Sequence, residues 1–106
     1  MPQADLSYVD KLIAALGHVE PLTRQRAAYL LGLIGETCAV PPLIEVLATD
    51  EDPYPRAEAA LALGAIGTPS ARAALEEVSA RAGQSVIVKR AAARALLQMS
   101  KHPCTP

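Results

Sequence analysis

Apolar side chains recur three and four positions apart along most of the chain, which is the spacing of an amphipathic α-helix. After Pro21, for example, one apolar stripe runs through Ala27, Ala28, Leu31 and Ile34. Polar turns, glycines and prolines interrupt the pattern at short intervals. The predicted elements are therefore short helices, each with one face turned toward a shared core.

The same pattern returns with a period of 32 residues. Residues 21–48 and 53–80 are identical at 13 of 28 aligned positions. A period in this range, with helical spacing inside it, is typical of stacked helical pairs. The sequence thus predicts an all-α fold, a short right-handed α-solenoid of about five antiparallel helices.

Residues that favour helix ends give the boundaries. Ser7 followed by Asp10 has the form of a capping box, so the first helix is expected to begin at Ser7. Pro21 suits a first helical turn, and Gly35 suits the position just after a helix. We expect one domain, made of a half repeat at 5–17, repeats at 21–48 and 53–82, a terminal helix at 86–100 and a flexible tail at 101–106.

Composition agrees with tight helix packing, because 21 of the 106 residues are alanine and only 3% are aromatic. The net charge is −1, but residues 1–70 carry nine acids and four bases, and residues 71–106 carry two acids and six bases. This segregation fits a solvated surface, head-to-tail contact between modules, or an anionic partner at the C-terminal end.

One repeated string resembles a known family. Arg-x-x-Ala-Ala-x-x-Leu-Gly-x-Ile-Gly occurs at Arg24–Gly35 and again at Arg56–Gly67. It is similar to the HEAT repeat of the phycobilisome-lyase type. The resemblance implies that the helices carrying this string form the convex face, and that their arginines pair with acidic turn residues. That structural ladder would comprise Arg24, Arg56, Asp50 and Asp52. It also admits a role as a subunit of a bilin lyase-like system.

Candidate chemistry is sparse. His18 and His102 are the two histidines, and neither forms a metal-ligand set with neighbouring Cys, Asp or Glu. Cys38 and Cys104 are expected to be reduced thiols. No phosphate loop or nucleophile motif is present. We therefore expect no catalytic residue, no metal and no cofactor. The first residues do not resemble a secretory signal and no stretch is apolar enough to span a bilayer, so a cytoplasmic protein is expected.

Two surfaces are candidates for binding. Helical geometry places Glu45 and Glu77 outward at successive repeats, on the face expected to be concave, where they suit a cationic peptide or serve only for solubility. Lys89, Arg90 and Arg94 form a short basic cluster in the C-terminal half, which suggests nucleic acid as a minor alternative. The full set of candidate partner-binding residues is Pro41, Glu45, Ala73, Glu77, Lys89, Arg90 and Arg94.

The ends of the stack are a third candidate surface. Leu6, Val9, Leu12 and Ile13 lie at one end, and Val86, Ile87, Leu97 and Met99 lie at the other. Exposed apolar residues there predict self-association or docking through an end. The sequence as a whole favours a non-enzymatic protein-interaction scaffold that binds a protein or peptide.

Overall fold

The computed structural model describes the backbone of residues 2–101 and the side chains of residues 8–100. Within these ranges the chain forms six α-helices and one short 3-10 helix, with no strand. The expected all-α solenoid is confirmed, with one helix more than the expected five. The elements are α1 (Pro2–Ala15), α2 (Pro21–Ile34), η1 (Thr37–Ala39), α3 (Val40–Thr49), α4 (Pro53–Ile66), α5 (Pro69–Ala80) and α6 (Val86–Lys101).

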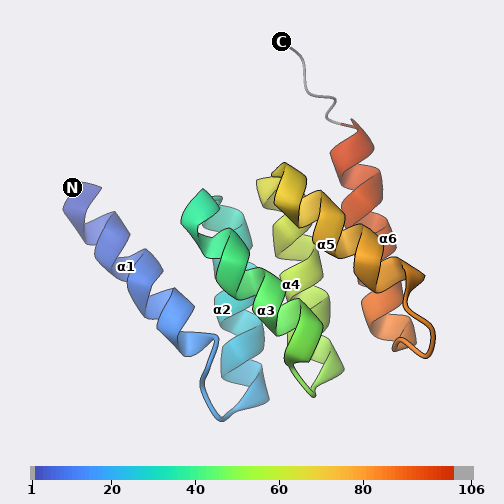
Figure 1. Ribbon diagram of the computed structural model, residues 1–106. Coiled ribbons are helices and arrows are strands. Elements are labelled where there is room, and N and C mark those ends of the chain that lie inside the picture. The colour runs from blue at the N-terminus through green and yellow to red at the C-terminus, as the bar shows by residue number, and fades with distance from the viewer. Residues whose placement is uncertain (1, 102–106) are drawn as a thin grey trace.

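The helices alternate between two layers. Figure 1 shows α1, α3 and α5 in the nearer layer and α2, α4 and α6 behind them. The molecule measures 41 × 40 × 15 Å along its principal axes, so it is a thin slab. α4 occupies the centre and packs against α2, α3, α5 and α6. None of the described helices is both long and apolar enough to cross a membrane.

Predicted signals explain most helix ends. Gly35 and Gly67 follow α2 and α4 with φ of 81° and 77°, a backbone region that glycine enters without a Cβ penalty. Asp52 accepts a hydrogen bond from the backbone N–H of Tyr54 at 2.9 Å and so caps α4. Thr68 does the same for α5 through the N–H of Ala71. The two glycines thus end α2 and α4, and the two side-chain caps begin α4 and α5.

Two boundaries differ from expectation. α1 begins at Pro2, so Ser7 lies inside the helix and is not its cap. Proline is well tolerated in a first helical turn, so the helix begins at Pro2 and continues through Ser7. α6 continues through Ser100 to Lys101, because the glycine that ends α2 and α4 is absent at that position. The predicted tail, including His102 and Cys104, otherwise falls outside the described residues.

The core lies between the two layers and is built from the repeated positions. Leu31 and Leu63 project from α2 and α4, and Leu43 and Leu75 project from α3 and α5. All four are fully buried. Each buried leucine removes enough apolar surface from water to contribute roughly 1.5–3 kcal/mol. The 32-residue period therefore reflects mainly the positions that pack in the core.

Close helix approach is confined to one layer. An ideal Cβ added to Gly32 would lie 2.8 Å from the Cα of Ala62, and one added to Gly64 would lie 2.8 Å from the Cα of Ala95. The backbones of α2, α4 and α6 therefore touch through glycine and alanine. α1 and α3, in the other layer, are separated by a groove of about 300 Å³.

This difference in spacing bears on the expected curvature. A stack curves toward the layer whose helices are closer together, because that layer has the shorter path. In a longer stack of the same geometry, the α2–α4–α6 face would be concave. The resemblance implied the opposite assignment, with these helices convex. The two assignments differ because the glycine-to-alanine contacts bring α2, α4 and α6 closer to one another than α1 is to α3.

The two ends of the stack are less apolar than the sequence suggests. Val9 and Leu12 are buried against the neighbouring helices, as is Met99 in α6. Val86 and Leu97 remain exposed, at 66% and 59%. The prediction for Leu6 concerns a side chain outside the described residues. Self-association through the ends stays a prediction.

Candidate functional site

Arg24 forms the most extensive polar contact of the molecule. Its Nε and Nη2 donate to the two carboxylate oxygens of Asp50 at 2.7 and 2.9 Å. Its Nη1 donates to the backbone carbonyls of His18 and Val19 at 2.8 and 3.0 Å. A bidentate arginine–carboxylate pair fixes both distance and orientation. This contact therefore ties the α1–α2 turn and α2 to the end of α3.

The pKa of Asp50 is lowered by this arrangement. Burial alone would raise it, but the hydrogen bonds from Arg24 and from the backbone N–H of Asp52 outweigh that effect. The pKa of Arg24 is raised, first by the hydrogen bond to Asp50, although burial opposes it. Both groups are therefore held in their charged forms, and the pair is structural in character.

Arg56, the second arginine of the expected ladder, has a different hydrogen-bond partner. Arg56 donates from Nε to the backbone carbonyl of Leu47 at 2.8 Å. Asp52 caps α4 and is not paired with Arg56 within the described residues. Of the four ladder residues, the structure thus joins Arg24 to Asp50 and gives Arg56 and Asp52 separate roles.

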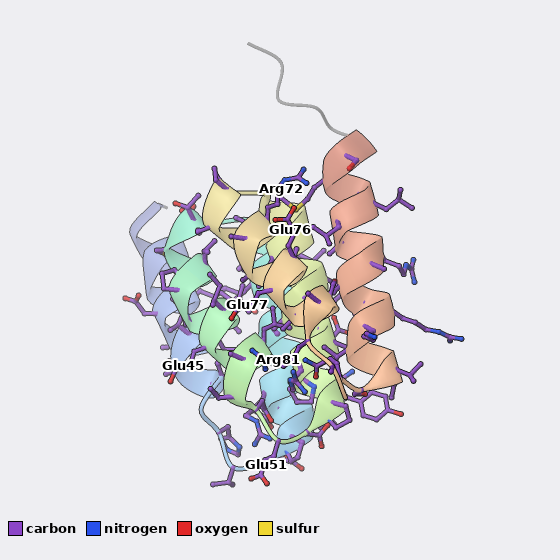
Figure 2. All side chains as sticks on the ribbon, turned by 45° about the vertical axis from the view of Figure 1, so that its right-hand side comes forward. Glu45, Glu51, Arg72, Glu76, Glu77 and Arg81 are labelled. Carbon is purple, nitrogen blue, oxygen red and sulfur yellow. The ribbon has the colours of Figure 1, made fainter. Side chains whose placement is uncertain are left out.

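The predicted acidic pair lies on the α1–α3–α5 layer. Glu45 on α3 and Glu77 on α5 are both exposed (Figure 2). Pro41 and Ala73, one turn earlier on the same helices, are exposed as well. Glu45 also lines the groove between α1 and α3, beside Ile13 and Leu16 of the α1 end. No described contact links the two carboxylates to each other, so they act as separate surface groups.

The basic cluster lies on α6. Lys89, Arg90 and Arg94 are all exposed. Arg94 lines a shallow groove of about 270 Å³ with Leu61, Leu97 and Gln98. Among the side chains of residues 8–100, none of these three cations forms an ion pair. The cluster is therefore a solvated helix face.

The sequence analysis did not predict a groove that lies between α2 and α4. It measures about 220 Å³ and its walls are apolar. Tyr29 and Leu33 come from α2 and are 53% and 66% exposed, and Leu61 and Ala65 come from α4. Glu58 is the one charged side chain in the lining. A carboxylate at the edge of an apolar channel suits a ligand with an aliphatic stem and a cationic end.

A signal for this groove exists in the sequence. Tyr29 and Leu33 are four residues apart and so share a face of α2, and that face is not the one that carries Leu31. A second apolar stripe on a helix whose first stripe already fills the core indicates a surface with another use. The groove also lies on the layer that the glycine contacts place inside the curve of a longer stack.

The histidine and cysteine side chains have modest roles. His18 Nδ1 accepts the backbone N–H of Glu20 at 3.0 Å and so shapes the α1–α2 turn. Cys38 is a free, exposed thiol in η1. Residues 8–100 contain no group of three or more His, Cys, Asp or Glu side chains positioned to hold a metal ion.

A family model for HEAT repeats matches residues 9–98, nearly the whole of the described fold. The chain belongs to the HEAT-repeat family. The broader part of the sequence resemblance is therefore confirmed. Its finer part, the phycobilisome-lyase type, is not what the similar proteins are.

The similar HEAT-repeat proteins are hydroxylases. Deoxyhypusine hydroxylase of Neurospora crassa is 40% identical over 85 residues, which are 79% of this chain and 26% of that protein. The Chaetomium globosum enzyme of the same name is 36% identical over 84 residues, 78% of this chain and 24% of that protein. Human deoxyhypusine hydroxylase, solved in complex with glycerol, superposes with a TM-score of 0.80 at 34% identity, over 89% of this chain and 32% of that one.

These findings correct the functional expectation. The relatives and the structural neighbour are named as enzymes, so a non-enzymatic interaction scaffold is contradicted. The bilin lyase-like and nucleic-acid alternatives fail on the same ground. HEAT repeats serve many functions, so the repeated sequence pattern alone does not distinguish among them. This HEAT-repeat chain spans about a quarter of the length of the curated relatives it matches.

Proposed function

We propose that this chain acts in deoxyhypusine hydroxylation, as a HEAT-repeat segment of the kind found in deoxyhypusine hydroxylases. The observation that supports this proposal is the human enzyme, whose fold matches 89% of the chain at a TM-score of 0.80 and 34% identity. Identity of 36–43% to three fungal proteins of the same name supports it independently. In this proposal the segment contributes part of a longer solenoid surface.

The residues present limit what the segment does within such an enzyme. Hydroxylation of a carbon requires an activated oxygen, which enzymes generate with a metal or an organic cofactor. The donor set of residues 8–100 does not fit a metal centre, because no three potential ligands come together there. The proposed contribution is therefore recognition and positioning of the substrate.

The α2–α4 groove is the part of the surface that best suits this role. Deoxyhypusine is a lysine derivative whose side chain carries an aliphatic stem and an amine. Tyr29, Leu33 and Leu61 would cover the stem, and Glu58 would accept hydrogen bonds from the ammonium group. The glycine contacts beneath the groove hold α2 and α4 at a fixed spacing, so the channel is formed before the substrate arrives.

The test is binding of a peptide that contains deoxyhypusine, measured by calorimetry against the same peptide with lysine. We expect the deoxyhypusine peptide to bind more tightly. Glu58→Gln should weaken its binding about tenfold, the scale of one charge-assisted hydrogen bond. Glu77→Gln is the matched control, because it removes an exposed carboxylate from the other layer and should leave binding unchanged.

Two outcomes would overturn the proposal. One is the absence of binding at millimolar peptide, and the other is equal loss in both variants, which would indicate nonspecific attraction to negative charge.

A further inference from the structure

The two layers of the fold differ in charge. The helices α2, α4 and α6 together carry seven basic residues and one acidic residue, a balance of +6. The helices α1, α3 and α5 carry two basic and five acidic residues, a balance of −3. The net charge of −1 for the whole chain conceals this division. The α2–α4–α6 layer therefore suits a partner that carries acidic groups.

Glu58 is the single acid of the helices in that layer, and it lines the α2–α4 groove. Within residues 8–100, the exposed charged side chains of these helices are all basic: Arg26, Lys89, Arg90 and Arg94. Because like charges repel, an ammonium group that approaches this layer is favoured only beside Glu58. One residue thus fixes where a cationic group of a ligand lies on this face.

A second groove adjoins the first. It measures about 270 Å³ and is lined by Leu61, Arg94, Leu97 and Gln98. Leu61 lines both grooves, with α2 across the first groove and α6 across the second. Figure 1 shows α4 and α6 side by side, and the two helices pack closely together. The grooves are therefore neighbours on one face, and a single peptide is long enough to occupy both.

The repeat changes its chemistry between the two grooves. The glycine-to-alanine contacts align α4 with α2 at an offset of 32 residues and α6 with α4 at an offset of 33. Arg94 and Gln98 of α6 therefore stand where α4 has Leu61 and Ala65. In α2 the first of these positions is Tyr29. The surface is apolar between α2 and α4 and gains a guanidinium and an amide between α4 and α6.

Arg94 has no acidic counterpart on its own helix. α6 carries four basic residues and no acid, and Arg94 forms no ion pair with the side chains of residues 8–100. Arg90 lies one turn earlier, and like charges at this spacing weaken a helix. A carboxylate from a bound partner would relieve this repulsion, and the guanidinium fork matches its two oxygens.

We propose that the groove formed by Leu61, Arg94, Leu97 and Gln98 is a second subsite for the substrate polypeptide, and that it takes a glutamate side chain. Leu61 and Leu97 cover the methylene groups of the glutamate, and Arg94 binds its carboxylate. This inference rests on the proposed function, in which the α2–α4 groove takes the deoxyhypusine side chain. The opposite charges of Glu58 and Arg94 then orient the polypeptide across α4.

The spacing of the helices sets the spacing of the two side chains in the substrate. Closely packed helix axes lie roughly 8–10 Å apart, so adjacent grooves of one layer are separated by a similar distance. In an extended peptide, side chains two residues apart point to the same face and are separated by about 7 Å. The glutamate therefore lies two residues from the deoxyhypusine.

The test is calorimetry with four peptides. The central residue is deoxyhypusine or lysine, and the residues two positions before and after it are both glutamate or both glutamine, so that the direction of binding does not matter. We expect the glutamate peptide with deoxyhypusine to bind about three- to fivefold more tightly than its glutamine counterpart, the scale of a partly exposed ion pair. Arg94→Gln should abolish this preference.

Two further variants make the result specific. Arg90→Gln removes an exposed cation of the same helix that does not line the groove, and it should retain the preference for glutamate. Glu58→Gln should weaken binding of both deoxyhypusine peptides and leave the ratio between them unchanged, because the two subsites bind different side chains.

Equal binding of the glutamate and glutamine peptides by the unaltered chain would overturn the inference. So would loss of the preference in Arg90→Gln to the same extent as in Arg94→Gln, since that would show diffuse attraction to a basic surface. Equal binding of the deoxyhypusine and lysine peptides with a retained glutamate preference would contradict the proposed function and support the second subsite. Absence of binding by all four peptides at millimolar concentration would overturn both.

Discussion

Asp50 shows how one side chain can join elements that are distant in sequence. Its carboxylate holds Arg24, 26 positions earlier, through two short hydrogen bonds, and also accepts the backbone N–H of Asp52. The resemblance implied that Arg24 would find an acid of this turn. Which acid it would find, and that Arg56 would find none of its own, depended on coordinates that the sequence does not contain.

The first prediction concerns this pair and pH. Asp50→Asn should lower the Tm of the chain by about 5 °C at neutral pH, because a charged bidentate contact becomes a neutral one. The pKa of Asp50 is lowered in the folded state, so its stabilisation is present above the unfolded pKa and is lost as pH falls through the folded one. Thermal melts of wild type and variant should therefore begin to converge below about pH 4 and coincide only below the lowered folded pKa.

A matched control separates the pair from general charge effects. Asp10→Asn removes an exposed carboxylate of α1 and should change Tm by only about 1 °C at any pH. If Asp50→Asn and Asp10→Asn behaved alike, the Arg24–Asp50 contact would contribute nothing measurable.

At the scale of the element, the sequence predicted helices well and their spacing poorly. Proline, glycine and capping residues set the ends of α2, α4 and α5, since these signals act within a few residues. Gly32 and Gly64 fall three positions before the glycines that end their helices, and the sequence analysis gives them no role. The structure shows that they lie within the helices and let α2, α4 and α6 approach one another.

The second prediction follows from that contact. Gly64→Ala should destabilise the chain by about 1–3 kcal/mol, because its Cβ would lie 2.6 Å from the Cβ and 2.8 Å from the Cα of Ala95, and a backbone atom cannot move aside cheaply. Urea denaturation would measure the change in the free energy of unfolding.

Gly17→Ala serves as its control. An added Cβ there would lie 3.6 Å from the carbonyl oxygen of Ala14, an ordinary contact, so the effect should stay within about 0.5 kcal/mol. Equal stability of wild type and Gly64→Ala would show that α4 and α6 can separate freely, contrary to the packing described above.

At the scale of the whole molecule, stability depends on the central helix. α4 contacts four other helices, and Leu63 at its centre is fully buried. Leu63→Ala should cost about 2–5 kcal/mol of the free energy of unfolding, from lost burial and the cavity left behind. A domain of this size has only about 5–15 kcal/mol in total. We therefore expect one cooperative transition with a much lower urea midpoint.

Val86→Ala provides the comparison at the periphery. Val86 begins α6 and is 66% exposed, so its truncation should change stability by no more than about 0.5 kcal/mol. Two separate transitions in Leu63→Ala, detected by circular dichroism at successive urea concentrations, would show that the two sides of the stack fold independently.

The sequence by itself determined the all-α class, the repeat and most helix ends, because periodicity, proline, glycine and capping groups act over short distances. The family resemblance, and not the local pattern, implied that Arg24 pairs with an acid of the next turn. Tertiary structure decided what depends on three-dimensional proximity. It placed Gly32 and Gly64 against alanines, opened a groove with Glu58 between α2 and α4, and gave Arg56 the backbone carbonyl of Leu47 in place of a carboxylate. Neither the sequence pattern nor the fold by itself indicated a function, because many proteins share this stacking pattern and differ in the chemistry of their surfaces.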